Sequence, residues 1–273
     1  MDKPAVIDEV IRASTPRKLN VSEFPSRRHY YWAYQYMLAN LYLCPQLERW
    51  GFDFKGKSVL DVGCGTGGIA CTMMDRGARV DGVDIFDLEK PYLEDKPFRF
   101  IIGDMCDPAL LQQLDRVYDF AILRDVIEHI ADKKSMLQNI ADALKSGGKL
   151  FITFPPYYSP FGGHTQILQS SLGLIPYTHL LPKSVFQRFV NRIDAHDYSK
   201  EEVLRLKEIR TTISEVESVI AQLPFRILQR KYYAIRPTFH IRYGVKPLPA
   251  LWGRIPLLRE VAVMAAFYYL EKR

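Results

Sequence analysis

Long apolar runs and paired cysteines are both missing from this sequence of 273 residues. No stretch of about 20 apolar residues exists, so no transmembrane helix is expected. The first ten residues carry four charges and lack the apolar centre of a signal peptide. No Cys-x-x-Cys pair occurs, so neither a zinc site nor a disulfide framework is indicated. These absences predict a protein of the reducing cytoplasm. The four cysteines are Cys44, Cys64, Cys71 and Cys106.

Charged residues are absent from one internal segment and unevenly spread elsewhere. Between Lys149 and Lys183 there is no Asp, Glu, Lys or Arg, which is unusual for a surface connection. Residues 226–273 carry ten Lys and Arg against two Glu, a balance of +8 in a chain whose net charge is +6. This basic C-terminal region suits either an anionic partner or the solvated edge of a sheet.

The stretch from Val59 to Gly68 has the pattern of a buried strand, a glycine-rich turn and the start of a helix. Glycines in the turn allow the backbone to bend tightly and to approach a ligand closely. Gly63, Gly65 and Gly68 also satisfy the G-x-G-x-x-G pattern of dinucleotide sites, so the spacing alone is ambiguous. Asp61 separates the two interpretations, because a carboxylate there suits an ammonium group and would repel a pyrophosphate.

Further strand and helix patterns follow in alternation. Residues 79–85, 98–105, 118–123 and 149–154 have strand character, and residues 132–144 have the apolar spacing of a helix. This rhythm predicts an α/β fold with a doubly wound, mostly parallel sheet. Asp84 ends the second strand, 23 residues after Asp61. A carboxylate at that place can accept both hydroxyl protons of a ribose.

Together these features resemble the class I S-adenosylmethionine (SAM)-dependent methyltransferases, whose first motif has the form acidic-x-Gly-x-Gly-x-Gly. The segment Ile127-Glu-His-Ile130 is similar to the Leu-Glu-His-Val of ubiquinone-biosynthesis O-methyltransferases. The resemblance implies SAM as the cofactor and a Rossmann-like sheet of seven strands with an antiparallel last strand. Methyl transfer from SAM demands no metal, and Asp125, Glu128 and Asp132 are only a weak indication of metal ligands. Residues 225–235 and 260–270 are strand-like and match the reversed sixth and seventh strands of that family.

The resemblance also assigns cofactor-binding roles to residues at the strand ends. Asp61 is expected near the amino-acid part of SAM, and Asp84 at its ribose. Asp104 is expected to read the adenine amino group while Met105 packs on the ring, and Asp125 is a charged neighbour of the methyl donor. The full expected set is Asp61, Gly63, Cys64, Gly65, Thr66, Gly67, Asp84, Ile85, Asp104, Met105, Arg124 and Asp125.

Two histidines are candidates for a general base, since imidazole is the side chain best tuned near neutral pH. His164 follows a Gly-Gly pair inside the uncharged segment and is the first candidate, with a hydrogen-bonded loop histidine as the alternative. His129 is the second candidate, with a structural hydrogen bond as its alternative. The residues expected to bind the substrate are Tyr31, Tyr157, Tyr158 and His179, with packing as the alternative for the three tyrosines.

Four regions are expected along the chain. Residues 1–50 form an N-terminal helical lid, 51–156 the SAM-binding core, 157–224 a helical and loop substrate cap inserted into the fold, and 225–273 the strands that complete the sheet. Within the insertion, residues 201–223 have the apolar spacing of one amphipathic helix. The uncharged segment serves either as a substrate wall or as a contact in a homodimer.

The predicted function is methyl transfer from SAM to a small molecule, at a hydroxyl or phenol oxygen of an apolar or aromatic compound. A phosphate or carboxylate of that compound would meet basic C-terminal residues. The alternatives are an RNA or protein methyltransferase and a SAM-binding regulator without catalysis. Nucleic acid is the less favoured partner, because the Asn-Pro-Pro-Tyr-like motif of nucleic-acid amino methyltransferases is absent after the fourth strand.

Overall fold

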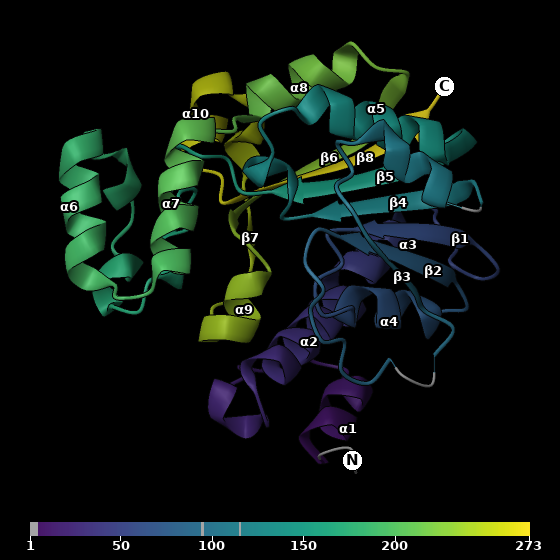
Figure 1. The fold of residues 1–273 in the computed structure, drawn as a ribbon, viewed down its shortest axis with the longest axis horizontal. Helices are drawn as coiled ribbons and strands as arrows, with labels where there is room; N and C mark the ends of the chain where they lie inside the picture. Colours follow the sequence, from purple (N-terminus) through teal and green to yellow (C-terminus); the bar gives the residue numbers. More distant parts are fainter. Residues whose placement is uncertain (1–4, 94–95, 115) are drawn as a thin grey trace.

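The computed structural model describes residues 5–93, 96–114 and 116–273. In these residues one sheet of eight strands is covered by helices on both faces (Figure 1). The strands are β1 (Ser58–Val62), β2 (Arg79–Asp84), β3 (Arg99–Ile102), β4 (Tyr118–Arg124), β5 (Leu144–Phe154), β6 (Phe225–Ile235), β7 (Leu248–Pro249) and β8 (Ala265–Lys272). The seven expected strands are present, and β7 adds a short edge strand.

The strand order is β3-β2-β1-β4-β5-β8-β6-β7. Strands β1 to β5 pair in parallel, and β8 is antiparallel to both β5 and β6. The prediction of a mostly parallel sheet with an antiparallel last strand is therefore confirmed. The expectation that the sixth strand is also reversed is wrong, because β8 lies between β5 and β6 and leaves β6 running in the direction of β5.

Two hydrophobic clusters cover the two faces of the sheet, and alternate residues of each strand belong to different clusters. Along β5, Phe151 packs in one cluster and Ile152 in the other. The first cluster includes the N-terminal helices α1 (Ala5–Arg12), α2 (Arg27–Leu38) and α3 (Cys44–Arg49) together with α4 (Gly68–Met74). The second includes α5 (Lys133–Ala143) and α8 (Ile213–Ala221). Burial on both faces explains the nearly continuous apolar strands.

The amphipathic segment expected at 201–223 is two helices, α7 (Asp197–Ile209) and α8. Arg210 adopts a left-handed conformation with φ of 54° and ends α7. Thr212 then caps α8, because its hydroxyl accepts the Glu215 N–H at 3.0 Å. The apolar spacing continues across this break, so periodicity alone did not reveal it. The last strand is also shorter than expected, because residues 256–261 form α10 (Pro256–Val261).

The part of the inserted region that contains α6 (Lys183–Ile193) and α7 projects to one side of the sheet (Figure 1, left), whereas α8 covers the sheet next to α5. Helices α6 and α7 enclose a small core of their own, made of Leu168, Phe186, Val190 and Val203. Helices α2 and α9 (Thr238–Tyr243) lie below α7 in the view of Figure 1. Among the described residues, none of the helices combines the length and the apolar character needed to cross a bilayer.

Candidate active site

The glycine turn after β1 requires glycine at defined positions. Gly63, Gly65 and Gly67 have φ of 73°, 54° and 78°, values that residues with a Cβ rarely adopt. A Cβ on Gly63 would lie 2.3 Å from the side chain of Val126, the residue that follows Asp125 after β4. The turn therefore brings its backbone close to the end of β4.

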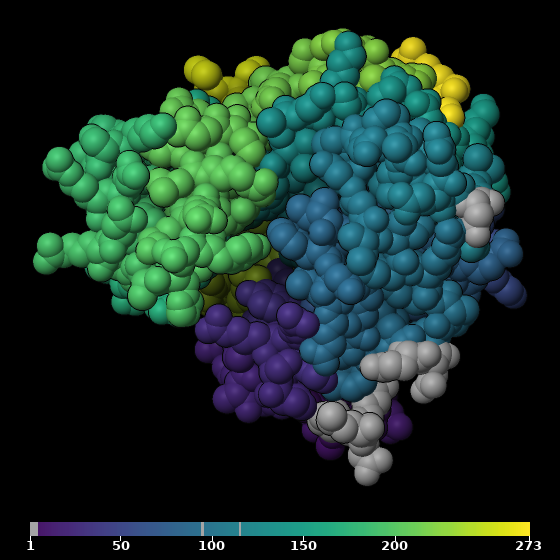
Figure 2. Space-filling model, viewed as in Figure 1, coloured from purple at the N-terminus to yellow at the C-terminus, as the bar shows by residue number. Residues whose placement is uncertain are grey.

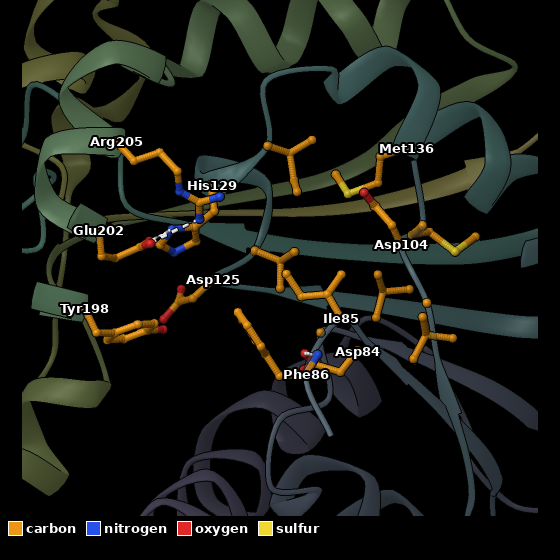
Figure 3. Close-up of a pocket in the computed structure, with 17 residues that line it drawn as sticks. Asp84, Ile85, Phe86, Asp104, Asp125, His129, Met136, Tyr198, Glu202 and Arg205 are labelled. Atoms are coloured by element: carbon orange, nitrogen blue, oxygen red, sulfur yellow. Dashed lines mark hydrogen bonds and ion pairs between the residues drawn. The ribbon is translucent and has the colours of Figure 1, made fainter. Parts of the chain in front are cut away.

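A cavity of about 300 Å³ opens at the carboxyl ends of β1 to β4 (Figure 3). Such strand ends are where ligands bind in open α/β sheets, and this volume lies in the range of small-molecule sites. Six residues of the expected cofactor set line it: Gly63, Asp84, Ile85, Asp104, Met105 and Asp125. Tyr198, Glu202 and Arg205 of α7 close the side that faces the inserted region.

Local backbone groups hold two of the carboxylates that line this cavity. Asp84 accepts hydrogen bonds from the N–H groups of Gly65 at 2.8 Å and Phe86 at 3.0 Å. Asp104 accepts one from the N–H of Cys106 at 2.8 Å. Both side chains are thus fixed in orientation beside the cavity.

Asp61 lies behind this cavity and does not line it. It is only 1% exposed, and its Oδ2 has no hydrogen-bond partner among the described residues. Burial, together with the charge of Asp84, raises the pKa of Asp61 to about 7. A buried carboxylate oxygen without a partner is the kind of group that a cationic ligand atom satisfies.

Cys64 and Thr66, two further residues expected at the cofactor, contact other parts of the protein in this structure. Cys64 is buried, and its Sγ lies close to Gly82 of β2. Thr66 donates from its hydroxyl to Gln35 Oε1 at 2.9 Å and so ties the turn to α2. Arg124 belongs to a second cavity, next to the first.

The second cavity, of about 360 Å³, lies between α2, α9, the end of β4 and the loop after β5. Asp125 and Tyr198 line both cavities. The surface is hollowed where the inserted region, the N-terminal helices and the sheet meet (Figure 2). The lining residues are Tyr31, Tyr34, Gln35, Arg124, Asp125, His164, Gln166, Ile167, Tyr198, Arg236, Thr238, Phe239, Arg242 and Tyr243.

Three arginines and one carboxylate give the second cavity a surplus of positive charge. Asp125 forms ion pairs with Arg124, at 2.7 Å, and with Arg236. Burial alone would raise the pKa of Asp125, but these two guanidinium groups outweigh it and hold that pKa well below its usual range. Arg242 lies over the Tyr34 ring at 4.7 Å. The Nε atoms of Arg236 and Arg242 are buried and have no hydrogen-bond partner among the described residues.

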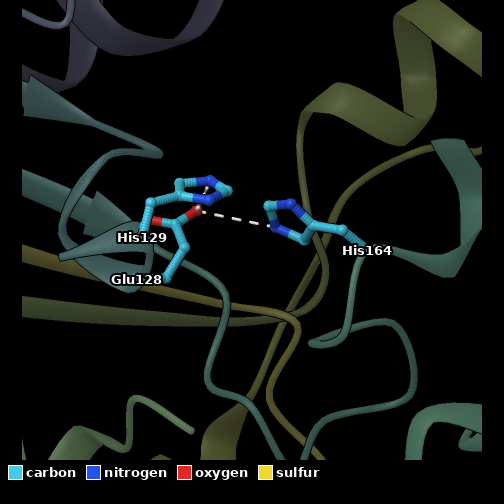
Figure 4. A group of neighbouring side chains, drawn as sticks. All are labelled: Glu128, His129 and His164. Atoms are coloured by element: carbon cyan, nitrogen blue, oxygen red, sulfur yellow. Dashed lines mark ion pairs between the residues drawn. The ribbon is translucent and has the colours of Figure 1, made fainter. Parts of the chain in front are cut away.

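The two predicted catalytic histidines lie together with a buried glutamate (Figure 4). The rings of His129 and His164 are 5.0 Å apart, and Glu128 Oε1 lies 3.7 Å from His129 Nε2 and 3.6 Å from His164 Nε2. Burial lowers the pKa of His164 to about 3, so this imidazole is neutral at pH 7. Burial also raises the pKa of Glu128 to about 7. We call these three residues the Glu-His-His cluster.

A second carboxylate contacts the cluster from α7. Glu202 forms an ion pair with Nδ1 of His129, on the ring edge opposite to Glu128. Burial alone would lower the pKa of His129, but Glu202 and Glu128 outweigh it and raise that pKa.

The predicted substrate residues divide between three places. Tyr31 lines the second cavity. Tyr157 and His179 line neither cavity and bond to each other, because the Tyr157 hydroxyl donates to the His179 carbonyl at 3.1 Å and His179 Nε2 lies 2.7 Å from the Tyr157 carbonyl. Tyr158 lies in a separate groove with Leu257 and Leu258. Tyr157 and His179 are therefore buried side chains that pack together, whereas Tyr158 is 36% exposed in its groove.

Arg236 and Arg242 were not singled out from the sequence as individual site residues, and neither were Tyr34 and Glu202. A usable signal existed for Arg236, which follows β6 directly. A strand that runs parallel to the core ends at the same edge as β1 and β4, where ligands bind. The direction of β6 depends on the insertion of β8, which local sequence does not reveal.

Comparisons with known proteins agree with this geometry. A family model described as "Methyltransferase domain" matches residues 31–198. A ubiquinone biosynthesis O-methyltransferase of Coxiella burnetii (strain Dugway 5J108-111) is 31% identical over 162 residues, which are 57% of this chain and 66% of that protein. This chain thus spans slightly less than two thirds of that relative's length.

Two further proteins extend the comparison. Phosphoethanolamine N-methyltransferase 2 of Caenorhabditis elegans is 34% identical over 139 residues, 44% of this chain and 31% of that protein. The structure of magnesium protoporphyrin IX methyltransferase from Synechocystis PCC 6803 with bound SAH has a TM-score of 0.51 at 15% identity. The aligned residues cover 98% of this chain and 93% of the Synechocystis chain, which shows that the two proteins share a fold.

Proposed function

This chain belongs to the class I SAM-dependent methyltransferases, and from that premise we propose that it methylates an oxygen of a small aromatic acceptor that carries an anionic group. One observation supports this class of acceptor: the second cavity is lined by more buried guanidinium groups than carboxylates. An acceptor with a carboxylate or phosphate would supply the missing negative charge.

The cofactor is assigned to the first cavity. SAM supplies a methyl carbon bound to a positively charged sulfur, which accepts the electron pair of the broken carbon–sulfur bond. Asp84 is proposed to accept the ribose hydroxyl protons and Asp104 to accept from the adenine amino group, since both carboxylates line the cavity and are held in place. Asp61 is proposed to pair with the amino-acid ammonium, which its unpartnered buried oxygen suits.

The acceptor is assigned to the second cavity, whose walls combine aromatic and cationic groups. Tyr31, Phe239 and Tyr243 offer ring surfaces, while Arg236 and Arg242 offer guanidinium groups. Arginine binds carboxylate and phosphate in two parallel hydrogen bonds, so these residues would fix the orientation of the acceptor as well as its charge. Because Asp125 lines both cavities, an acceptor held here lies next to the cofactor site, and alignment is the main requirement of methyl transfer.

Oxygen is the proposed nucleophile for an electrostatic reason. A surplus of positive charge disfavours a cationic amine and favours an acceptor hydroxyl that loses its proton. The Glu-His-His cluster, with His129 at the first cavity and His164 at the second, is the proposed place of that activation. The hydroxyl proton passes to water, the oxygen forms a bond to the methyl carbon, and the electron pair of the carbon–sulfur bond goes to sulfur.

The contacts of the basic C-terminal region do not favour an RNA acceptor. Arg236 and Arg242 lie inside the second cavity. Arg226 pairs with Glu271, and Arg259 pairs with Glu217. These four side chains are therefore engaged within the protein instead of forming a free surface for phosphates.

A paired-acceptor assay tests this proposal. The full chain is incubated with methyl-labelled SAM and either 3,4-dihydroxybenzoate or catechol, which differ by one carboxylate, and products are identified by mass spectrometry. We expect an O-methyl product with kcat/KM at least about 10-fold higher for the carboxylated compound, the scale of one charged hydrogen bond. Equal values for the two compounds would contradict the anionic acceptor, and methylation only of amines would contradict oxygen as the nucleophile.

A further inference from the structure

We infer that Glu128, His129 and His164 bind one divalent transition-metal ion at the junction of the two cavities. Binding of the ion does not depend on the proposed function, whereas the role of the ion in activating the acceptor rests on it. The sequence alone indicated no metal, because the three ligands come from two separate segments, one after β4 and one after β5.

The distances between the donor atoms fit a shared ion. Glu128 Oε1 is 3.7 Å from His129 Nε2 and 3.6 Å from His164 Nε2, and all three donor atoms lie within 4.8 Å of one another. Zinc bonds to nitrogen and oxygen are about 2.0–2.2 Å long, so tetrahedral ligands stand roughly 3.4 Å apart. Only small side-chain movements would bring the three atoms onto one ion.

The burial of Glu128 without hydrogen-bond partners is a second, independent observation that points to a cation. This side chain is 2% exposed, and neither of its carboxylate oxygens has a hydrogen-bond partner among the described residues. Burial of a carboxylate without such partners is costly, and coordination of a cation removes that cost. The oxygens face two imidazoles, with Oε1 3.7 Å from His129 Nε2 and 3.6 Å from His164 Nε2 (Figure 4).

Glu202 holds His129 in the orientation that coordination needs. It contacts Nδ1, which leaves Nε2 directed toward Glu128. A histidine that binds a metal commonly donates its other ring N–H to a carboxylate, which fixes its tautomer. Because Glu202 belongs to α7, the inserted region contributes this positioning residue to the site.

The donor set indicates the class of ion. Two imidazoles and one carboxylate suit Zn²⁺, Co²⁺, Mn²⁺ or Fe²⁺, whereas Mg²⁺ and Ca²⁺ prefer oxygen ligands only. Three protein ligands leave a coordination position open for an acceptor oxygen. An ion there lowers the pKa of a bound hydroxyl, whose proton then passes to water. In this arrangement both histidines are ligands, and neither serves as the general base.

The test is metal binding by the full chain after removal of metals with a chelator. Titration with Co²⁺ is followed by visible absorption, and titration with Zn²⁺ by calorimetry. We expect one ion per chain. Glu128→Gln and His164→Ala should each weaken binding by at least about 100-fold, and Glu202→Gln by about 10- to 100-fold, the effect typical of an outer-shell partner.

His196→Ala is the matched control, because His196 is an exposed histidine at the start of α7 and should bind Co²⁺ as the wild type does. Circular dichroism of each variant verifies the fold. Absence of Co²⁺ and Zn²⁺ binding by the wild type, or equal binding by folded His164→Ala, would overturn the inference.

The two proposals fail separately in this design. Asp84→Ala should lose SAM binding and keep Co²⁺ binding, which shows that the ion does not depend on the cofactor. Co²⁺ binding in a wild type that methylates neither test acceptor supports the metal site and counts against the proposed function. Unchanged methyl transfer by the chelated protein would overturn the role of the ion in activation.

Discussion

Asp125, at the end of β4, and Arg236, at the end of β6, form an ion pair between residues 111 positions apart in the sequence. The pair exists because β6 runs parallel to the core strands and ends at the same edge of the sheet. Arg124 contacts the same carboxylate oxygen, Oδ2, at 2.7 Å. One carboxylate therefore cannot neutralise the arginines of the second cavity, and this imbalance is the basis of the proposed acceptor class.

Arg236→Gln should raise KM for 3,4-dihydroxybenzoate by at least about 10-fold, because a charge-assisted hydrogen bond to the acceptor is lost. The KM for catechol should change much less, since catechol carries no carboxylate. Steady-state kinetics with both compounds measure the difference. Arg254→Gln is the control, because Arg254 is exposed and lines neither of the two cavities. An equal rise in KM for both compounds would contradict the role of Arg236.

Gly63→Ala should destabilise the protein by roughly 2–4 kcal/mol, because the added Cβ meets Val126 at 2.3 Å and the φ of 73° is strained for alanine. Gly56→Ala is the matched control, with a similar φ of 71° and no atom of the described residues within 4 Å of an added Cβ. It should cost only about 1 kcal/mol. Denaturant unfolding measures the free energy of unfolding of both variants. Equal losses of this free energy would mean that the close approach of the turn to Val126 is unimportant.

Asp61→Asn should change how stability depends on pH in the SAM-free protein. The pKa of Asp61 is about 7 in the folded chain, against an ordinary value of 3.8, so the folded state binds more protons between these values. The free energy of unfolding should therefore fall as pH rises from about 4 to 7, and the variant should lack this contribution.

Denaturant unfolding at pH 4 and pH 8 checks this expectation. The free energy of unfolding of the variant should exceed that of the wild type at pH 8 by on the order of 4 kcal/mol, with little difference at pH 4. Asp87→Asn, a change at an exposed side chain, should follow the wild type at both values. Parallel pH dependence of Asp61→Asn and wild type would show that Asp61 is not a strained buried carboxyl.

The core of the fold could be predicted because its signals are local. Apolar runs that end in Asp84 or Asp104 and alternate with helices define the parallel strands, and the glycines at 63 and 65 have the positive φ that the turn needs. The break at Arg210 was missed, because an apolar stripe contains no sign of one left-handed residue.

The site was predictable only where it follows from strand ends. Asp84 and Asp104 line the first cavity, since their position depends on the parallel sheet alone. Arg236 depends on where β8 inserts, and the pairing of Tyr157 with His179 depends on how a long loop folds. His129 and His164 were named as alternatives, whereas packing of the loop after β5 brings them to one cluster.

The central claim is that the cavity at the ends of β1 to β4 holds SAM, and calorimetric titration of SAM into Asp84→Ala tests it most directly. Asp87→Ala, three residues along, is the control. We expect wild type and control to bind SAM alike, and Asp84→Ala to lose at least about 10-fold in affinity with an intact fold by circular dichroism. Unchanged affinity in folded Asp84→Ala would contradict the account.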